Sequence, residues 1–184
     1  KELYADVMKY FIIACSFIFL ATMLNLSWIQ YFVGKEFRSG LDVVPILLIA
    51  NLCLGAFFNL SIWYKLTDRT LLGAFVSIGG ALLTVVLNLL FIPKYGYMAS
   101  AWATLACYGG MALASYLLGQ KYYPVQYDLK KIGGYVAFGL ALWVAFEKVS
   151  GIAGVSRNWT ATLFMLIFLA VVYLIDVRKA RPIV

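Results

Sequence analysis

The sequence predicts an all-α integral membrane protein, built as a bundle of six transmembrane helices. The chain has 184 residues, of which 64% are hydrophobic and only 12% are charged, and its mean hydropathy is +0.90. Soluble domains average about 45–50% apolar and about 25% charged residues. Several apolar runs also exceed the roughly 18 residues that mark a membrane span, and a soluble chain of this length could not bury so many helices that are apolar all round.

Six apolar segments have the length of a membrane-spanning helix. In the hydrocarbon core they must be helical, because an open strand would leave backbone groups without hydrogen bonds. The opening stretch KELYADVMKY can extend the first segment as a solvated helix. No connection is long enough for a soluble module, so we expect one transmembrane domain over residues 1–184, with helices at about 9–33, 43–64, 70–92, 97–119, 132–149 and 159–177.

Short polar or helix-breaking connections set the ends of these segments. Tyr and Trp residues gather near several of the ends, as interfacial anchors do. Pro93 and Gly96 should break the chain between the third and fourth segments, and Pro124 should do so after the fourth. The connections run from 34 to 42, from 65 to 69, from 93 to 96, from 120 to 131 and from 150 to 158.

Basic residues are distributed unevenly between the two sides of this topology. Ten lie on the side that holds both termini: Lys1, Lys9, Lys65, Arg69, Lys121, Lys130, Lys131, Arg178, Lys179 and Arg181. Five lie on the other side: Lys35, Arg38, Lys94, Lys148 and Arg157. The positive-inside rule therefore predicts that both termini are cytoplasmic. Because the basic residues are scattered over short loops, the net charge of +7 does not indicate nucleic-acid binding.

The chain offers little for catalysis or metal binding. It has no His, and Cys15, Cys53 and Cys107 lie in separate apolar segments where they should act as small hydrophobes. Acidic residues are confined to loops and span ends, without a partner for acid–base chemistry. We therefore expect no enzymatic activity, no cofactor and no bound metal, and we expect no functional charge deep in a span.

Amides are the polar side chains expected inside the spans. Asn51, Asn59 and Asn88 lie deepest in their segments. Such amides either line a polar cavity, which would make them substrate-path candidates, or hydrogen-bond to a neighbouring helix. In the KLTDRT connection, Lys65 and Arg69 are candidates for binding a lipid phosphate. The alternative is an ordinary charged loop with a helix N-cap at Thr67 or Asp68.

The fourth segment is rich in small residues, including Gly109 and Gly110. Small residues allow close approach of neighbouring helices, so this segment is expected to lie inside the bundle.

The residues from Thr84 to Tyr108, TVVLNLLFIPKYGYMASAWATLACY, resemble the N-x-x-L-I-P-x-Y-G-x-x-G-A-A-x-A-T signature of the polysaccharide-biosynthesis flippases. This family belongs to the exporter superfamily that also holds the multidrug MATE transporters and the lipid II flippases. Met98, Ala99 and Ser100 depart from the usual Gly-Ala-Ala. The matching residues are Asn88, Ile92, Pro93, Tyr95, Gly96, Ala101, Ala103 and Thr104.

The resemblance implies a MATE-like transporter with two lobes and alternating access between them. This chain would be its C-terminal portion, the last six of about fourteen spans, and the missing N-terminal lobe would be a partner. The implied substrate is an undecaprenyl-linked oligosaccharide for capsule or O-antigen synthesis, moved across a bacterial inner membrane. Two alternatives stay open: a multidrug exporter of the same superfamily, and a non-transporting polytopic membrane protein of glycan assembly.

Overall fold

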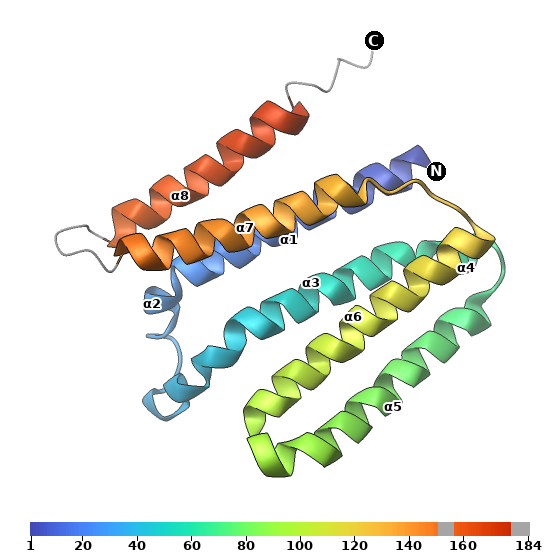
Figure 1. Cartoon of the computed structure of the whole chain (residues 1–184), viewed down its shortest axis with the longest axis horizontal. Coiled ribbons are helices and arrows are strands. Elements are labelled where there is room, and N and C mark those ends of the chain that lie inside the picture. The colour runs from blue at the N-terminus through green and yellow to red at the C-terminus, as the bar shows by residue number, and fades with distance from the viewer. Residues whose placement is uncertain (151–156, 178–184) are drawn as a thin grey trace. The chain divides into compact units, whose positions relative to one another are not determined.

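The computed structural model describes residues 1–150 and 157–177, and this part of the chain is helical with no strand (Figure 1). The predicted all-α class is therefore confirmed. A 3-10 segment, Lys35–Val43, precedes α3, and a π-helical turn, Tyr173–Val177, follows α8. The α-helices are α1 (Glu2–Leu24), α2 (Leu26–Ile29), α3 (Val44–Leu60), α4 (Ile62–Leu66), α5 (Thr70–Tyr95), α6 (Tyr97–Tyr122), α7 (Leu129–Ser150) and α8 (Arg157–Val172).

Six helices of the described residues are long and apolar enough to cross a membrane, which confirms that part of the prediction. The second of them combines the 3-10 segment with α3 and α4. The third and fourth start where the sequence predicts, at residues 70 and 97. The six spans are Glu2–Leu24, Lys35–Leu66, Thr70–Tyr95, Tyr97–Tyr122, Leu129–Ser150 and Arg157–Asp176.

The first span differs from the predicted range of 9–33, because α1 starts at Glu2 and ends at Leu24. The backbone of Asn25 leaves the helical region, with φ −102° and ψ 14°. Its side-chain amide donates a hydrogen bond to the carbonyl of Ala21 at 2.8 Å. This side chain closes the last turn of α1, and the chain continues into the short helix α2. The early start shows that the opening residues do extend the first helix.

Gly96 alone ends α5, whereas the sequence prediction assigned the break to Pro93 as well. The helix continues through Pro93 to Tyr95, because the residues beyond the proline still bond backwards: the Gly96 N–H donates to the Ile92 carbonyl at 2.8 Å. Gly96 then adopts φ 63° and ψ −149°. That conformation is essentially restricted to glycine, and it lets α6 begin at the very next residue.

The chain divides into two compact units, and the predicted single domain stays a prediction. Unit 1 comprises residues 1–11 and 36–128. In this unit α6 lies between α3 and α5 (Figure 1). The buried residues of α6 are mostly small, and Trp102, Leu113 and Leu117 are exposed on it.

Unit 2 comprises residues 12–35 and 129–184. Its described core joins the second part of α1 to α7 and α8. Phe138 stacks on Phe168, with ring centroids 5.8 Å apart. The buried members of this core are Ile13, Leu20, Leu24, Tyr135, Phe146, Ala161 and Phe168.

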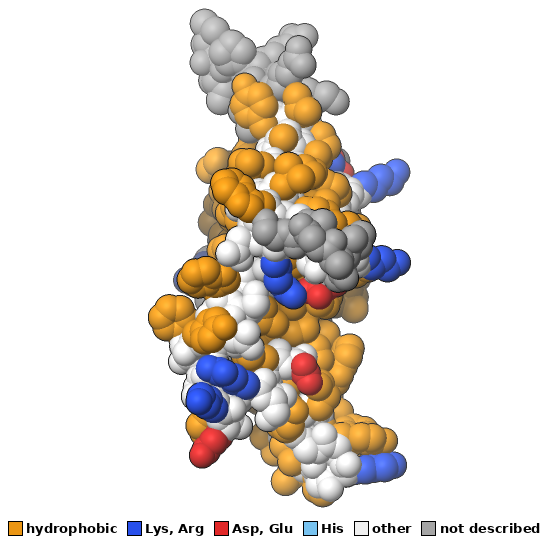
Figure 2. Space-filling model, turned by 90° about the vertical axis from the view of Figure 1, so that its left-hand side faces the viewer, with side chains coloured by type: hydrophobic (Ala, Val, Ile, Leu, Met, Phe, Trp, Pro, Cys, Tyr) orange, Lys and Arg blue, Asp and Glu red, His pale blue; other side chains and the backbone are white. Residues whose placement is uncertain are grey.

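Large apolar side chains are exposed along most helices. Gly80 is the only buried residue of α5, and Leu71 and Leu89 on this helix are both more than 70% exposed. The apolar side chains exposed along the helices match contact with lipid chains rather than with water. Figure 2 shows one face of the molecule, on which apolar side chains lie among several Lys and Arg and some Asp and Glu side chains.

The predicted orientation in the membrane stays a prediction. Part of it concerns Arg178, Lys179 and Arg181, which lie outside the described residues, as does the connection between α7 and α8, residues 151–156.

Candidate functional site

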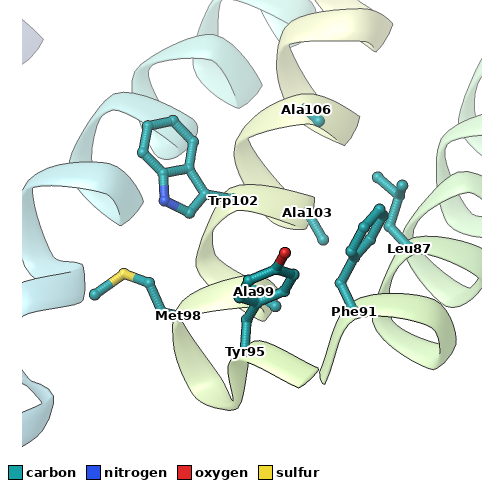
Figure 3. Close-up of a pocket in the computed structure, with 8 residues that line it drawn as sticks. All are labelled: Leu87, Phe91, Tyr95, Met98, Ala99, Trp102, Ala103 and Ala106. Carbon is teal, nitrogen blue, oxygen red and sulfur yellow. The ribbon is translucent and has the colours of Figure 1, made fainter. Parts of the chain in front are cut away.

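An open groove of about 490 Å³ lies between α5 and α6, next to the Gly96 turn (Figure 3). All of its lining residues fall within the stretch Thr84 to Tyr108 that carries the family resemblance. Three come from α5 and five from α6: Leu87, Phe91, Tyr95, Met98, Ala99, Trp102, Ala103 and Ala106.

The spacing of large and small side chains creates this groove. Leu87, Phe91 and Tyr95 recur every four residues, which places them along one face of α5. Ala103 and Ala106 lie across from Leu87 and Phe91 and leave the space between the helices open (Figure 3). The rise along the helix from Leu87 to Tyr95 is about 12 Å, close to the ~15 Å depth of one hydrocarbon leaflet.

A cation stands close to this groove. The Lys94 ammonium lies 5.2 Å from the centroid of the Tyr95 ring, and Tyr95 lines the groove. Lys94 is exposed and forms no ion pair with any described residue. The groove therefore presents an apolar channel with an unpaired positive charge at the end where α5 stops, an arrangement suited to an apolar chain with an anionic head.

The three amides predicted to line a substrate path are not brought together. Asn51 is exposed on α3 and donates to the carbonyl of Leu47 at 2.8 Å, and Asn59 donates to that of Gly55 at 3.0 Å. Both bonds return to the residue four positions earlier in the same helix, which neither of the sequence-based alternatives anticipated. Asn59 also borders a cavity of about 10 Å³, too small for a sugar.

Asn88 on α5 is the amide with an unsatisfied hydrogen-bond acceptor. Its Oδ1 atom is buried and accepts no hydrogen bond within the described part of the chain. A buried amide oxygen without a donor is costly, so this atom is the best candidate of the three for contact with water or substrate. None of the three amides is among the residues that line the α5–α6 groove.

Gly109 and Gly110 are not close-contact positions. A Cβ atom built at either would meet no atom within 4 Å. Gly110 instead borders a second hollow between α5 and α6, of about 320 Å³. The close approaches to α6 occur at two other glycines. A Cβ on Gly80 would lie 3.2 Å from the Sγ of Cys107, and one on Gly119 would lie 2.9 Å from the Nε1 of Trp63.

The two lipid-phosphate candidates have different surroundings. Lys65 is exposed on α4, whereas the Arg69 guanidinium lies 4.1 Å from the centroid of the Tyr122 ring. The expected N-cap at Thr67 or Asp68 is wrong, because Arg69 is the capping position of α5 and no side chain caps it. Thr67 donates instead to the carbonyl of Trp63 at 2.9 Å, and Asp68 has a left-handed φ of 54°.

Aromatic side chains surround the adjoining loop after α6. Burial raises the pKa of Tyr127 above its ordinary value of 10.0, and the neighbouring phenols of Tyr116 and Tyr123 raise it further. Tyr127 is therefore neutral at physiological pH and adds no negative charge to this end of unit 1.

One buried acidic side chain is not singled out by the sequence. Asp176 is only 7% exposed, although it belongs to the span Arg157–Asp176. The hydroxyl of Tyr135 on α7 donates a hydrogen bond to its carboxylate. The sequence predicts no functional charge deep in a span, and Asp176, the last residue of its span, does not contradict that prediction. The available signal was an acid inside the last turn of an apolar run, where the sequence alone suggests an interfacial position.

Metal-ligating side chains do not cluster in the described ranges 1–150 and 157–177: no group of three His, Cys, Asp or Glu residues could hold an ion there. The thiol of Cys107 donates instead to the carbonyl of Gly80 at 3.1 Å and helps to join α5 to α6.

Comparisons with protein-family models, with curated proteins and with solved structures give no match to this chain. The resemblance of residues 84–108 to the flippase signature therefore stays a prediction.

Proposed function

We propose that the protein is a membrane carrier of the flippase class, which moves an undecaprenyl-linked oligosaccharide from the inner to the outer leaflet of a bacterial inner membrane for surface polysaccharide synthesis. The observation that carries this proposal is the α5–α6 groove with Lys94 at its end.

The groove supports an amphiphilic lipid as the substrate. Its lining is made of aliphatic and aromatic side chains, which would accept a lipid chain over nearly one leaflet of depth. Lys94 would then meet the phosphate that joins such a chain to its sugar head, at the level where headgroups lie. A cationic drug would be repelled by the same lysine, which favours the lipid-linked substrate over the multidrug alternative.

The proposal that the substrate carries a sugar head is based on the family resemblance. A hydrophilic head needs a hydrated path through the membrane, and in two-lobe carriers this path lies between the lobes. The buried Oδ1 of Asn88, on a helix that lines the groove, has no hydrogen-bond partner in the described residues and is a candidate polar atom for such a path.

To test this proposal, the gene that encodes this chain is mutated so that the groove is filled or loses its charge. The variants are expressed in a cell that lacks any redundant exporter. Ala106→Leu adds bulk at an exposed lining position, and Lys94→Gln removes the charge. Ala141→Leu is the matched control, because Ala141 is exposed on α7 and lines none of the described grooves. Leu and Ala have similar helix propensities, so both Leu variants should fold.

We expect Ala106→Leu and Lys94→Gln to lower surface polysaccharide and to raise the lipid-linked precursor on the cytoplasmic leaflet. Ala141→Leu should change neither, at equal amounts of protein in the membrane. Normal surface glycan without precursor accumulation in a strain deleted for the whole gene would refute the flippase proposal.

A further inference from the structure

A rigid aromatic platform stands where α4 meets the end of α6. The Trp63 ring stacks on Tyr122, with centroids 5.9 Å apart and planes 26° from parallel. Trp63 is only 4% exposed, and its Nε1–H donates to the carbonyl of Ser115 at 3.2 Å. Packing and this bond hold the indole in place, so the Tyr122 ring has a fixed support.

Two cations are held over the same Tyr122 ring. The Arg69 guanidinium carbon lies 4.1 Å from the ring centroid, and the Lys121 ammonium lies 5.5 Å from it. Because both distances are measured to one centroid, the two charges lie near each other as well. The backbone of Arg69 is fixed as well, because its N–H donates to the carbonyl of Tyr64 at 2.8 Å. A third cation, Lys1, lies 4.6 Å over the ring of the adjacent Tyr123.

These cations have no protein counter-ion in the described part of the chain. The ion pairs given for that part join Lys9 to Asp6 and Arg157 to Glu147. Even Asp68, the chain neighbour of Arg69, forms no ion pair with it. Two like charges near one ring, with no acid between them, repel each other, so an anion that bound between them would stabilise the arrangement.

The position of this cluster indicates which anion it meets. Tyr122 ends the span Tyr97–Tyr122, Arg69 directly precedes the span Thr70–Tyr95, and Trp63 lies in the last turn of the span Lys35–Leu66. Three membrane-length helices therefore end at this cluster. The ends of such helices lie at the membrane–water boundary, which is where lipid phosphates are found.

We propose that Arg69, Lys121 and Tyr122 form a binding site for the phosphate headgroup of an anionic membrane lipid. Contact with the ring restricts the Arg69 guanidinium, whose planar fork of N–H groups suits phosphate oxygens. Lys121 supplies a second point charge. This site is independent of the proposed transport activity, because lipid binding is measured without transport.

Native mass spectrometry of the purified chain in neutral detergent tests this site, with phosphatidylglycerol titrated against phosphatidylcholine. Arg69→Gln and Lys121→Gln should each weaken phosphatidylglycerol binding about five-fold, and the double variant about 25-fold, if each cation contributes the usual ~1 kcal/mol. Tyr122→Phe keeps the ring and should bind as the parent does, whereas Tyr122→Leu should lose affinity. Lys148→Gln is the matched control, since it removes one exposed lysine in the last turn of α7, which contributes no residue to the proposed site.

Three results would overturn the proposal. Equal losses in Lys148→Gln and the Arg69/Lys121 double variant would show unspecific attraction. If the parent bound phosphatidylglycerol no more tightly than phosphatidylcholine, the site would not be selective for an anionic headgroup. Displacement of the lipid by equal concentrations of inorganic phosphate or glycerol phosphate would show that the site takes a soluble anion instead. Far-UV circular dichroism and unfolding temperatures equal to those of the parent establish that the variants are folded.

Discussion

Replacing Gly119 with Ala should destabilise unit 1, although the same change at Gly110 should not. The new Cβ at position 119 would lie 2.9 Å from the Nε1 atom and 3.1 Å from the Cδ1 atom of Trp63. The indole cannot swing away freely, because it is buried, stacked on Tyr122 and hydrogen-bonded to Ser115. At Gly110 a new Cβ would meet no atom within 4 Å.

The magnitude follows from these contacts. Overpacking of a filled site costs about 1–3 kcal/mol, and loss of the Trp63–Ser115 hydrogen bond would add about 0.5–1.5 kcal/mol. Both variants gain up to ~1 kcal/mol from the higher helix propensity of Ala, and this gain largely cancels when they are compared. The Gly119→Ala variant should therefore be about 1–4 kcal/mol less stable than Gly110→Ala.

Denaturant unfolding in mixed detergent micelles, followed by far-UV circular dichroism, measures this difference. Tryptophan fluorescence gives a second probe, because Trp63 should move in one variant alone. If the two free energies of unfolding agree within about 0.5 kcal/mol, the usual additivity error for separate sites, the close packing of Gly119 on Trp63 is refuted.

Three further results are expected. Gly96→Ala should lower the free energy of unfolding by about 1–3 kcal/mol, because φ 63° with ψ −149° excludes side chains; an unchanged unfolding curve would contradict this. Tyr135→Phe should lower the free energy of unfolding by about 1.5–3 kcal/mol, because it removes the hydrogen bond to Asp176. In an Asp176→Asn background the same substitution should lower it much less, as a double-mutant cycle would measure, and equal losses in the two backgrounds would mean that the hydrogen bond is not formed. Cysteines placed at Lys65 and Lys35 should react with an impermeant thiol reagent from the cytoplasmic and outer sides respectively, and the reverse pattern would exclude the predicted topology.

The sequence by itself determined which segments can cross a membrane. Hydrophobicity summed over ~20 residues is a local property, so the helices beginning at Thr70 and Tyr97 were predicted to the residue. Gly96 was also predicted as a break, because its backbone freedom is local. The effect of Pro93 as a helix breaker is smaller than the sequence predicts, since a single missing N–H near the end of a helix does not stop the residues after it from remaining helical.

Only the tertiary structure decided which polar and small residues matter. The sequence treats Gly110 and Gly119 alike, but only Gly119 has an indole against it. It also cannot show that Arg69 reaches Tyr122, or that Asp176 is covered and bonded by Tyr135. These contacts join residues that are distant in the chain, and they depend on which helices lie side by side. In a membrane, the hydropathy of a helix does not indicate which helices lie beside it, because a lipid chain and an apolar neighbouring helix are similar surroundings.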